Sequence, residues 1–391
     1  MKTKHTYIIF FSLLAVLLGI TGCNADASAG LFRQITESTK PVGIQYRQIL
    51  DKTATTLYFT TSEGISSTDG STSTQMKANT ADSRNLAAYL DSANNRVLFL
   101  INDPDAATNS AKVRSVTTGS PYTEITISDP SFALFNPYKI HNLYTNGLFL
   151  LQGIHATNGK TFSLSTYATN TFTNVVSFDA VTHGLADFSL ESVLQATGKE
   201  TIGVSSQPII VSFVDEAGNY THFYTIGATS HKITLNSRLA NFAIVNNTVY
   251  LLTTDGKLYN AGTYPITGPV DLGSASAMIS SNKVYDTNAF MYAVTGGGNT
   301  HIITKSVSKN DPLYVLSFAD GAATATGESI RYGYGEYLDS AEIVSSYEKG
   351  PNNLLVATAE NGMFELTIIP ASANSNSTSN GKSSESEEYT L

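Results

Sequence analysis

The chain contains one cysteine and few charged residues. Among its 391 residues the only cysteine is Cys23, and charged side chains make up 14%. A single thiol excludes an intramolecular disulfide, so an apolar core must hold the folded body together. The formal net charge of −9 disfavours nucleic acid and anionic membrane surfaces as partners, because both attract basic proteins.

Hydrophobic runs of membrane length are also absent. The apolar run over residues 7–20 is shorter than the ~20 residues that a spanning helix needs. It follows the basic start Met1-Lys2-Thr3-Lys4 and leads into small residues. This order of charge, short apolar run and small residues predicts a secretion signal over residues 1–22. An uncleaved anchor or a buried helix stays open as an alternative.

The run Ile20-Thr21-Gly22-Cys23 resembles the lipobox of bacterial lipoproteins, although that family favours leucine where Ile20 stands. In the family, the cysteine becomes the lipidated first residue of the mature protein. The resemblance therefore implies lipidation of Cys23 and a protein of the bacterial cell envelope, anchored to a membrane by its lipid. The outer membrane or the cell surface is favoured over the inner membrane.

Seven hairpin-like segments follow one another along the rest of the chain. Three of them share four apolar or β-branched residues, a polar turn that ends in glycine, and a second strand; they begin at Leu57, Val249 and Leu354. Looser copies begin at Val97, Leu148, Ile209 and Phe290. β-branched and aromatic residues favour strands, and glycine accepts the positive φ of a tight turn, so each segment predicts a β-hairpin.

The hairpins start about 40 to 64 residues apart, which is typical of propeller blades with inserted loops. With flanking strands such as residues 42–46, 240–245 and 341–345, they predict an all-β, seven-bladed β-propeller over residues 31–370. Six or eight blades, two packed β-sandwiches and a solenoid are the alternatives. Residues 187–197 have some helical spacing and predict at most a short inserted helix.

The two ends of the predicted body complement each other. Residues 31–35 have no blade of their own, and the last blade lacks a fourth strand after residues 363–369. We therefore expect these segments to pair and close the ring, which removes an open sheet edge. Residues 23–30 form a linker from the lipid, and the polar composition of residues 371–391 predicts a disordered tail.

One segment has a weak family resemblance. The run from Leu57 to Thr72 resembles the repeats of BNR or sialidase-type propellers, whose Asp-box reads Ser-x-Asp-x-Gly-x-Thr-Trp. Here Asp69 and Gly70 are adjacent, and the chain has no tryptophan. That absence also counts against WD-repeat and quinoprotein-type propellers. A sialidase would need an arginine cluster for its substrate carboxylate, whereas the arginines of this chain are few and scattered.

The sequence predicts no catalytic residue, cofactor or metal site. The histidines lack zinc-ligand spacing, and we expect His222 and His231 at the surface or in turns. The run Asn102-Asp103-Pro104-Asp105 lacks a complete calcium-loop pattern and predicts a turn. Gly296-Gly297-Gly298 lies within a hairpin, so it is no phosphate loop.

Two tyrosine-rich segments are the candidate binding residues. Tyr332, Tyr334 and Tyr337 alternate with glycine in the connection between the sixth and seventh blades, and Tyr138 and Tyr144 precede the third. Tyrosines on inserted loops provide amphipathic contact area. Packing between blades is the alternative, because tyrosine is frequent in this chain, with 21 copies.

These features predict a lipid-anchored binding or scaffold module whose partner is a protein or a glycan. One alternative is a polysaccharide hydrolase or lyase, which would need two carboxylates and an arginine or histidine in one pocket of the central funnel. Another is an assembly scaffold within the periplasm. Catalysis is not needed to explain any feature of the sequence.

Overall fold

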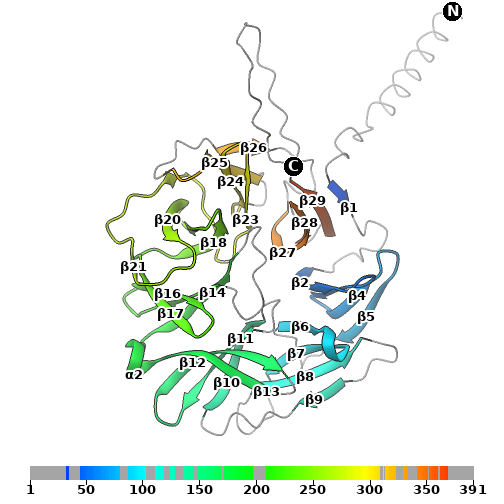
Figure 1. Cartoon of the computed structure of the whole chain (residues 1–391). Helices are drawn as coiled ribbons and strands as arrows, with labels where there is room; N and C mark the ends of the chain where they lie inside the picture. The colour runs from blue at the N-terminus through cyan, green and yellow to red at the C-terminus, as the bar shows by residue number, and fades with distance from the viewer. Residues whose placement is uncertain are drawn as a thin grey trace, which may run out of the picture.

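The fold is built almost entirely from strands. The structure is a computed structural model, and it describes residues 32–34, 45–79, 87–102, 111–118, 124–127, 135–143, 148–168, 171–196, 208–308, 311, 313–322, 329–332, 341–350, 352–359 and 362–368. Seven sheets follow one another along the chain and lie around a common centre (Figure 1). The all-β prediction is confirmed.

The sheets are numbered here in chain order. Sheet 1 contains β2 (Tyr46–Lys52), β3 (Leu57–Thr61), β4 (Gly64–Thr68) and β5 (Ser73–Ala78). Sheet 2 contains β6 (Ala87–Asp91), β7 (Arg96–Asn102), β8 (Ala111–Thr117) and β9 (Glu124–Ile127). Sheet 3 contains β10 (Phe135–Leu143), β11 (Leu148–His155), β12 (Gly159–Ala168) and β13 (Thr171–Asp179).

Sheet 4 contains β14 (Ser189–Gln195), β15 (Ile209–Val214), β16 (Tyr220–Ile226), β17 (Thr229–Thr234) and the added strand β21 (Val270–Asp271). Sheet 5 contains β18 (Leu239–Val245), β19 (Thr248–Thr253), β20 (Lys257–Thr263) and β22 (Ile279–Ser280). Sheet 6 contains β23 (Met291–Gly296), β24 (Asn299–Lys305), β25 (Leu313–Ala319) and β26 (Ser329–Tyr332). Sheet 7 contains β27 (Ile343–Gly350), β28 (Asn353–Thr358), β29 (Gly362–Thr367) and β1 (Phe32–Gln34).

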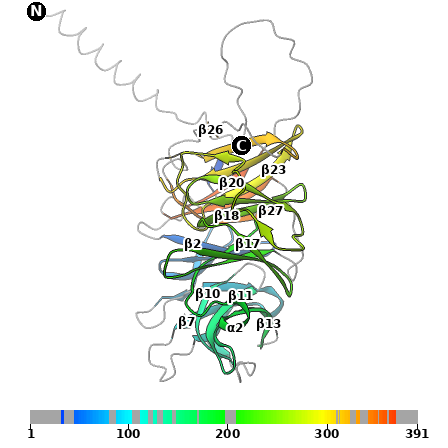
Figure 2. The same cartoon turned by 90° about the vertical axis from the view of Figure 1, so that its left-hand side faces the viewer.

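In each sheet the four main strands pair antiparallel, with β21 added parallel to β17 in sheet 4 and β1 completing sheet 7. This order defines two rims of the molecule, seen from the side in Figure 2. Rim A carries the turns between second and third strands and the connections to the next sheet. Rim B carries the turns between first and second strands and between third and fourth strands. The first strands of neighbouring sheets contact one another, as β2 does with β27 and β18 with β23, so the first strands lie innermost.

A buried threonine stabilises the turns that the sequence repeats most clearly. Thr253, at the end of β19, accepts a hydrogen bond from the Lys257 backbone N–H at 3.0 Å. Thr358 donates to the Gly362 carbonyl oxygen at 2.8 Å in the corresponding turn of sheet 7. Gly256 has a φ of +80°, and a Cβ there would lie 2.4 Å from the Lys283 carbonyl oxygen. The repeated Thr and Gly positions therefore have a direct physical basis.

Replacing Thr253 by valine should lower the free energy of unfolding by about 1 to 2 kcal/mol, because the buried turn loses its hydroxyl partner. Thr253 is fully buried, whereas the next residue, Thr254, is half-buried. Thr254→Val is therefore the matched control and should change stability less. Urea unfolding followed by far-UV circular dichroism measures both variants; equal losses in the two would contradict the turn argument.

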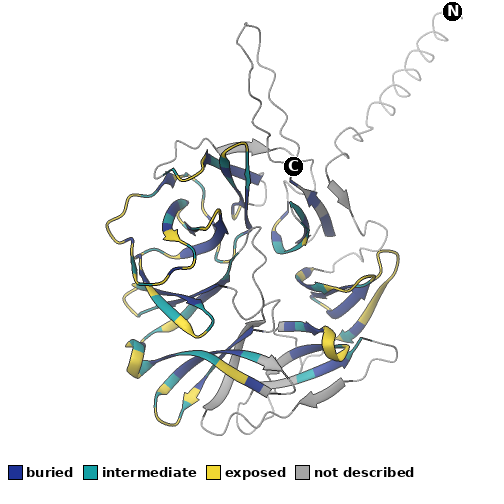
Figure 3. Cartoon of the chain, viewed as in Figure 1, coloured by how far each residue is buried: buried dark blue, intermediate teal, exposed yellow. Residues whose placement is uncertain are grey.

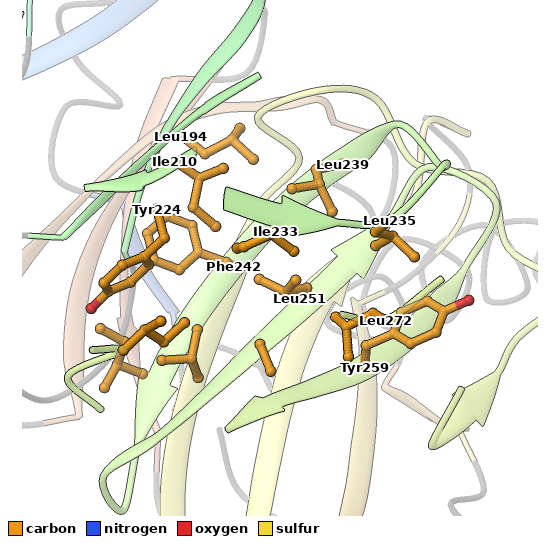
Figure 4. Packing of buried hydrophobic residues seen from close by; sticks show 14 residues of the cluster. Leu194, Ile210, Tyr224, Ile233, Leu235, Leu239, Phe242, Leu251, Tyr259 and Leu272 are labelled. Carbon is orange, nitrogen blue, oxygen red and sulfur yellow. The ribbon is translucent and has the colours of Figure 1, made fainter. Parts of the chain in front are cut away.

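Apolar clusters join consecutive sheets. The cluster in Figure 4 combines Leu194 and Ile210 of sheet 4 with Phe242 and Leu251 of sheet 5, and Leu272 from the loop after β20 packs against them. Figure 3 shows the buried positions concentrated along the strands. Similar clusters join sheets 1 and 2, 3 and 4, 5 and 6, 6 and 7, and 7 and 1. A ring contact between Tyr89 and Phe149 joins sheets 2 and 3. The core thus lies between the sheets as well as within them.

The N-terminal strand belongs to the last sheet. β1 pairs antiparallel with β29, with Phe32 opposite Leu366 and Gln34 opposite Phe364. The predicted pairing of residues 31–35 with residues 363–369 is therefore observed for these three residues of β1. Because β29 runs towards rim B and β1 runs antiparallel to it, the chain enters β1 from rim B.

The structure corrects several predicted elements. Residues 187–197 do not form a helix: β14 occupies this stretch, and the short helix α2 (Ala180–His183) precedes it. Val193 and Leu194 of β14 are buried in the apolar clusters of sheet 4, and this packing overrides the helical spacing. The hairpin predicted from Phe290 joins the first and second strands of sheet 6, whereas the other six hairpins join second and third strands. The first strand of sheet 1 begins at Tyr46, and residues 42–44 of the predicted flanking strand lie outside the described part of the chain.

Candidate functional site

Exposed aliphatic side chains gather on rim A. Among the described residues, the large hydrophobic side chains that stay exposed are Ile154 (52%), Val181 (74%), Val284 (58%) and Val307 (44%). Ile154 lies at the end of β11, beside the second-to-third turn of sheet 3, and Val181 lies in α2, which connects sheets 3 and 4. Val284 connects sheets 5 and 6, and Val307 lies between β24 and β25. All four positions belong to rim A.

The sheet 6 part of this rim combines apolar and charged groups. The Val307 backbone N–H donates to the Val284 carbonyl oxygen at 3.0 Å, which holds the two exposed valines next to each other. Beside them, the Lys283 Nζ lies 3.2 Å from the Asp311 carboxylate and 4.5 Å from the centre of the Tyr314 ring. An apolar pair flanked by an ion pair is the composition of a protein interface with a polar border.

Hydrogen bonds fix the charged border of this surface. The Ser306 hydroxyl donates to Asp311 Oδ2 at 2.6 Å, and the buried Lys305 donates from its Nζ to the Asp311 carbonyl oxygen. The Ser306 hydrogen bond and the Lys283 charge lower the pKa of Asp311, although partial burial opposes this shift. Tyr314 and Asp311 in turn raise the pKa of Lys283. Both groups are therefore charged at neutral pH, and the border is held rigidly.

The sheet 3 part of the rim is built on the capped helix α2. The Asp179 carboxylate accepts a hydrogen bond from the Thr182 backbone N–H at 2.6 Å. Burial opposes ionisation of Asp179, but the Thr182 hydrogen bonds and His183 lower its pKa. The cap stabilises a turn of helix that is too short to persist alone. It thereby holds Val181 on the outside of the molecule.

Two carboxylates on the innermost strands contact tyrosines of neighbouring sheets. The Tyr292 hydroxyl on β23 donates to Glu348 Oε1 on β27 at 3.1 Å. Burial, and then the Asp51 carboxylate on β2, raise the pKa of Tyr347 to about 12. Asp51 and Glu348 thus link sheets 6, 7 and 1 near the centre of the molecule. This arrangement is a set of contacts between sheets, and the polysaccharide-hydrolase hypothesis gains no specific support from it.

His222 was predicted at the surface or in a turn, and this prediction is wrong. The residue lies on β16 with 0% exposure. Its Nε2 lies 3.1 Å from the carbonyl oxygens of Leu235 and Ser237, and its Nδ1 lies 2.8 Å from the Ser212 hydroxyl. Because carbonyl oxygens only accept, Nε2 carries the proton and Nδ1 accepts from Ser212. Both ring nitrogens are therefore engaged within the core. By contrast, His231 on β17 is half-buried.

The sequence-predicted site residues lie mostly outside the described part of the chain. Cys23, Tyr144, Tyr334 and Tyr337 are not among the described residues. Tyr332 is the last residue of β26. Tyr138 lies on β10 at an irregularity of the pairing with β11, between the paired residues Pro137 and Lys139. The predicted loop positions of Tyr332 and Tyr138 are therefore wrong, because both belong to sheet strands. As the end of a fourth strand, Tyr332 lies on rim A.

Metal sites and membrane-spanning helices are both absent from the described residues. Within them, no three His, Cys, Asp or Glu side chains are grouped so that they could hold a metal ion. No helix in the same part of the chain has the length and hydropathy needed to cross a bilayer.

The order and packing of the sheets are those of a β-propeller. No family model and no curated protein matches the sequence. Among solved structures, YCF48 from Cyanidioschyzon merolae is 12% identical, with a TM-score of 0.46 and coverage of 86% of this chain and 99% of that chain. The WD40 β-propeller domain of Doa1 is 12% identical, with a TM-score of 0.43 and coverage of 84% and 94%. BamB from Moraxella catarrhalis is 9% identical, with a TM-score of 0.39 and coverage of 86% and 98%.

Proposed function

We propose that the chain is a lipid-anchored β-propeller of the bacterial cell envelope that acts as a binding or scaffold module. The observation that carries the binding role is the position of the four exposed aliphatic residues, all on rim A. Contiguous exposed apolar groups on one side of a folded body mark an interaction surface, and Val284 and Val307 lie next to each other on this rim. The anchoring role rests on the lipobox-like run that ends at Cys23.

The proposal includes a ring of seven blades closed by β1. The seven sheets would be the blades, and β1 would supply the fourth strand of the last one. The pairing of β1 with β29 and the apolar cluster that joins sheet 7 to sheet 1 support this arrangement. A closed ring leaves only short outer edges and holds rim loops rigidly, which suits a recognition surface.

The proposed anchor would lie on the side opposite to the proposed binding surface. The nine residue-to-residue steps from Cys23 to Phe32 span at most ~30 Å when extended. Because the chain enters β1 from rim B, this tether would hold rim B towards the membrane. Rim A, with Val284 and Val307, would then face away from the membrane and stay accessible to a partner.

The composition of rim A favours a protein over a glycan as the partner. Valine and isoleucine gain stability by burial against other apolar side chains, whereas sugars present mainly hydroxyl groups. The Lys283–Asp311 pair would supply the polar border of such a contact. Tyr332, at the end of β26, would extend this surface, and Tyr334 and Tyr337 follow it in the sequence. Tyr138 and Tyr144 stay candidates for a second contact.

Site-specific photo-crosslinking in the native host tests the binding role. A crosslinker at Val284 should capture the same identified envelope protein as one at Val181, and a crosslinker at the exposed Thr55 on rim B should not. Val284→Asp combined with Val307→Asp should reduce the capture at Val181 by roughly tenfold, because charges replace the apolar centre of the contact. Equal capture from Thr55, or capture that both aspartates leave unchanged, would refute the assignment of rim A.

A further inference from the structure

The turn between β11 and β12 contains an asparagine followed by a glycine. In the described part of the chain, Asn158-Gly159 is the only such pair with both residues described. Gly159 is exposed, has a φ of +68°, and a Cβ there would meet no atom within 4 Å. It is also the first residue of β12, and strand pairs open most readily at their ends. Water and hydroxide therefore reach the peptide bond between these two residues.

A glycine after an asparagine permits a reaction between the backbone and the side chain. No Cβ hinders the Gly159 nitrogen, so that nitrogen can attack Cγ of Asn158 once hydroxide has removed its proton. A bond forms between the Gly159 nitrogen and Cγ, the bond from Cγ to Nδ2 breaks, and ammonia leaves after taking up a proton. Water then opens the cyclic imide at either of its carbonyl groups, which gives aspartate or isoaspartate. The net reaction consumes water and releases ammonia, and it needs no oxidant or reductant.

The Asn158 side chain connects this turn to helix α2. Its Nδ2 donates to Asp179 Oδ2 at 3.3 Å. The same carboxylate caps α2 by accepting from the Thr182 backbone N–H. Ile154 lies at the end of β11, just before the turn, and Val181 lies in α2. The Asn158 hydrogen bond thus joins the two parts of rim A that present these exposed residues.

We propose that Asn158 is a site of spontaneous deamidation, and that the reaction releases the rim A turn of sheet 3 from α2. A carboxylate at position 158 has no proton to donate, and it places a negative charge against the ionised Asp179. Ile154 and Val181 then lose the contact that fixes their relative position. The expected weakening of partner binding rests on the proposed function of rim A, whereas the reaction itself does not.

Peptide mapping by mass spectrometry tests the reaction on the purified full chain, before and after incubation at mildly alkaline pH. The peptide that contains Asn158 should gain the mass difference between an amide and a carboxyl group, and it should separate into aspartate and isoaspartate forms. Asn158→Gln should abolish this gain, because the longer side chain closes a ring less readily.

Asn219 is the matched internal control for this reaction. It lies in the corresponding turn of sheet 4, is exposed, and donates from Nδ2 to Asp215 Oδ2 at 2.9 Å. Tyr220 follows it in place of a glycine, so its peptide should stay unchanged. A peptide at Asn158 that gains no more carboxyl group than the Asn219 peptide would overturn the proposal.

Hydrogen exchange measures the release of the turn. In Asn158→Asp the Thr182 amide should exchange roughly threefold to tenfold faster, because a hydrogen bond is lost and like charges lie in contact. Adding Asp179→Asn should restore slow exchange, because it removes the repulsion and keeps a good cap residue. Unchanged exchange in Asn158→Asp would refute the release. A mass gain at Asn158 together with no crosslinking at Val181 in any form would refute the role of rim A and support the reaction.

Discussion

Replacing His222 by alanine should lower the free energy of unfolding at pH 7 by about 4 kcal/mol. The substitution leaves a cavity in sheet 4 and removes the partner of three buried groups: the Ser212 hydroxyl and the carbonyl oxygens of Leu235 and Ser237. The two carbonyls belong to the connection from sheet 4 to sheet 5, so this residue ties the two sheets together. Urea unfolding followed by tyrosine fluorescence measures the loss, since the chain has 21 tyrosines and no tryptophan.

The same residue should make the protein sensitive to acid. Burial lowers the pKa of His222 from 6.5 to about 4, although the carbonyl oxygens of Ser237 and Leu235 favour the protonated ring. Between these two values the unfolded chain binds the proton and the folded chain does not, so stability falls as pH falls through this window. Above pH 6.5 the folded protein keeps its full stability with respect to His222. Acidification through this window lowers the free energy of unfolding by about 3 kcal/mol.

The difference between wild type and His222→Ala should therefore shrink on acidification. The variant has no imidazole at this position, so it escapes the acid-induced loss that this residue causes in the wild type. The other histidines are present in both proteins, so their contributions cancel in the comparison. His231→Ala is the matched control, because His231 is a half-buried histidine on the neighbouring strand β17. A gap that stays constant with pH would show that His222 does not control the acid response.

The strands were predictable from the sequence because local patterns determine them. The turns after Thr61, Thr253 and Thr358 repeat the same polar residues and glycine, and a glycine at Gly256 is enforced by the close approach of Lys283. Less regular sheets were harder. In sheet 6 the apolar run from Phe290 looks like the others, yet it forms the first strand. The sequence of residues 306–312 contains no glycine that would have marked the second-to-third turn.

The interaction surfaces were not predictable from the sequence, because they depend on tertiary position. Val284 and Tyr285 are adjacent in the sequence, but Val284 is exposed and Tyr285 is buried. The hydroxyl oxygens of Tyr285 and Thr304 lie 3.0 Å apart. His222 is an isolated histidine in a strand, and only the return of the chain at Leu235 and Ser237 gives it partners.

Replacing Cys23 by serine should remove the protein from the membrane. Lipid attachment needs the thiol, which a hydroxyl does not replace, and each buried CH₂ of an acyl chain contributes about 0.8 kcal/mol to membrane binding. No helix among the described residues has the length and hydropathy of a membrane span, and the net charge of −9 opposes binding to anionic lipid. Labelled fatty acid should therefore be absent from Cys23→Ser, and its membrane-bound fraction should fall at least roughly tenfold.

The adjacent substitution Asn24→Ser provides the matched control, because it keeps the thiol and should keep both the label and the membrane association. Label that persists in Cys23→Ser would refute lipidation at this residue. The folded body should be unaffected in either variant, since β1 begins nine residues later, at Phe32. The Cys23→Ser chain should unfold at the same urea concentration as the wild type, although it leaves the membrane. This result would separate the anchoring role from the binding role: the lipid would set where the protein is, and rim A would set what it binds.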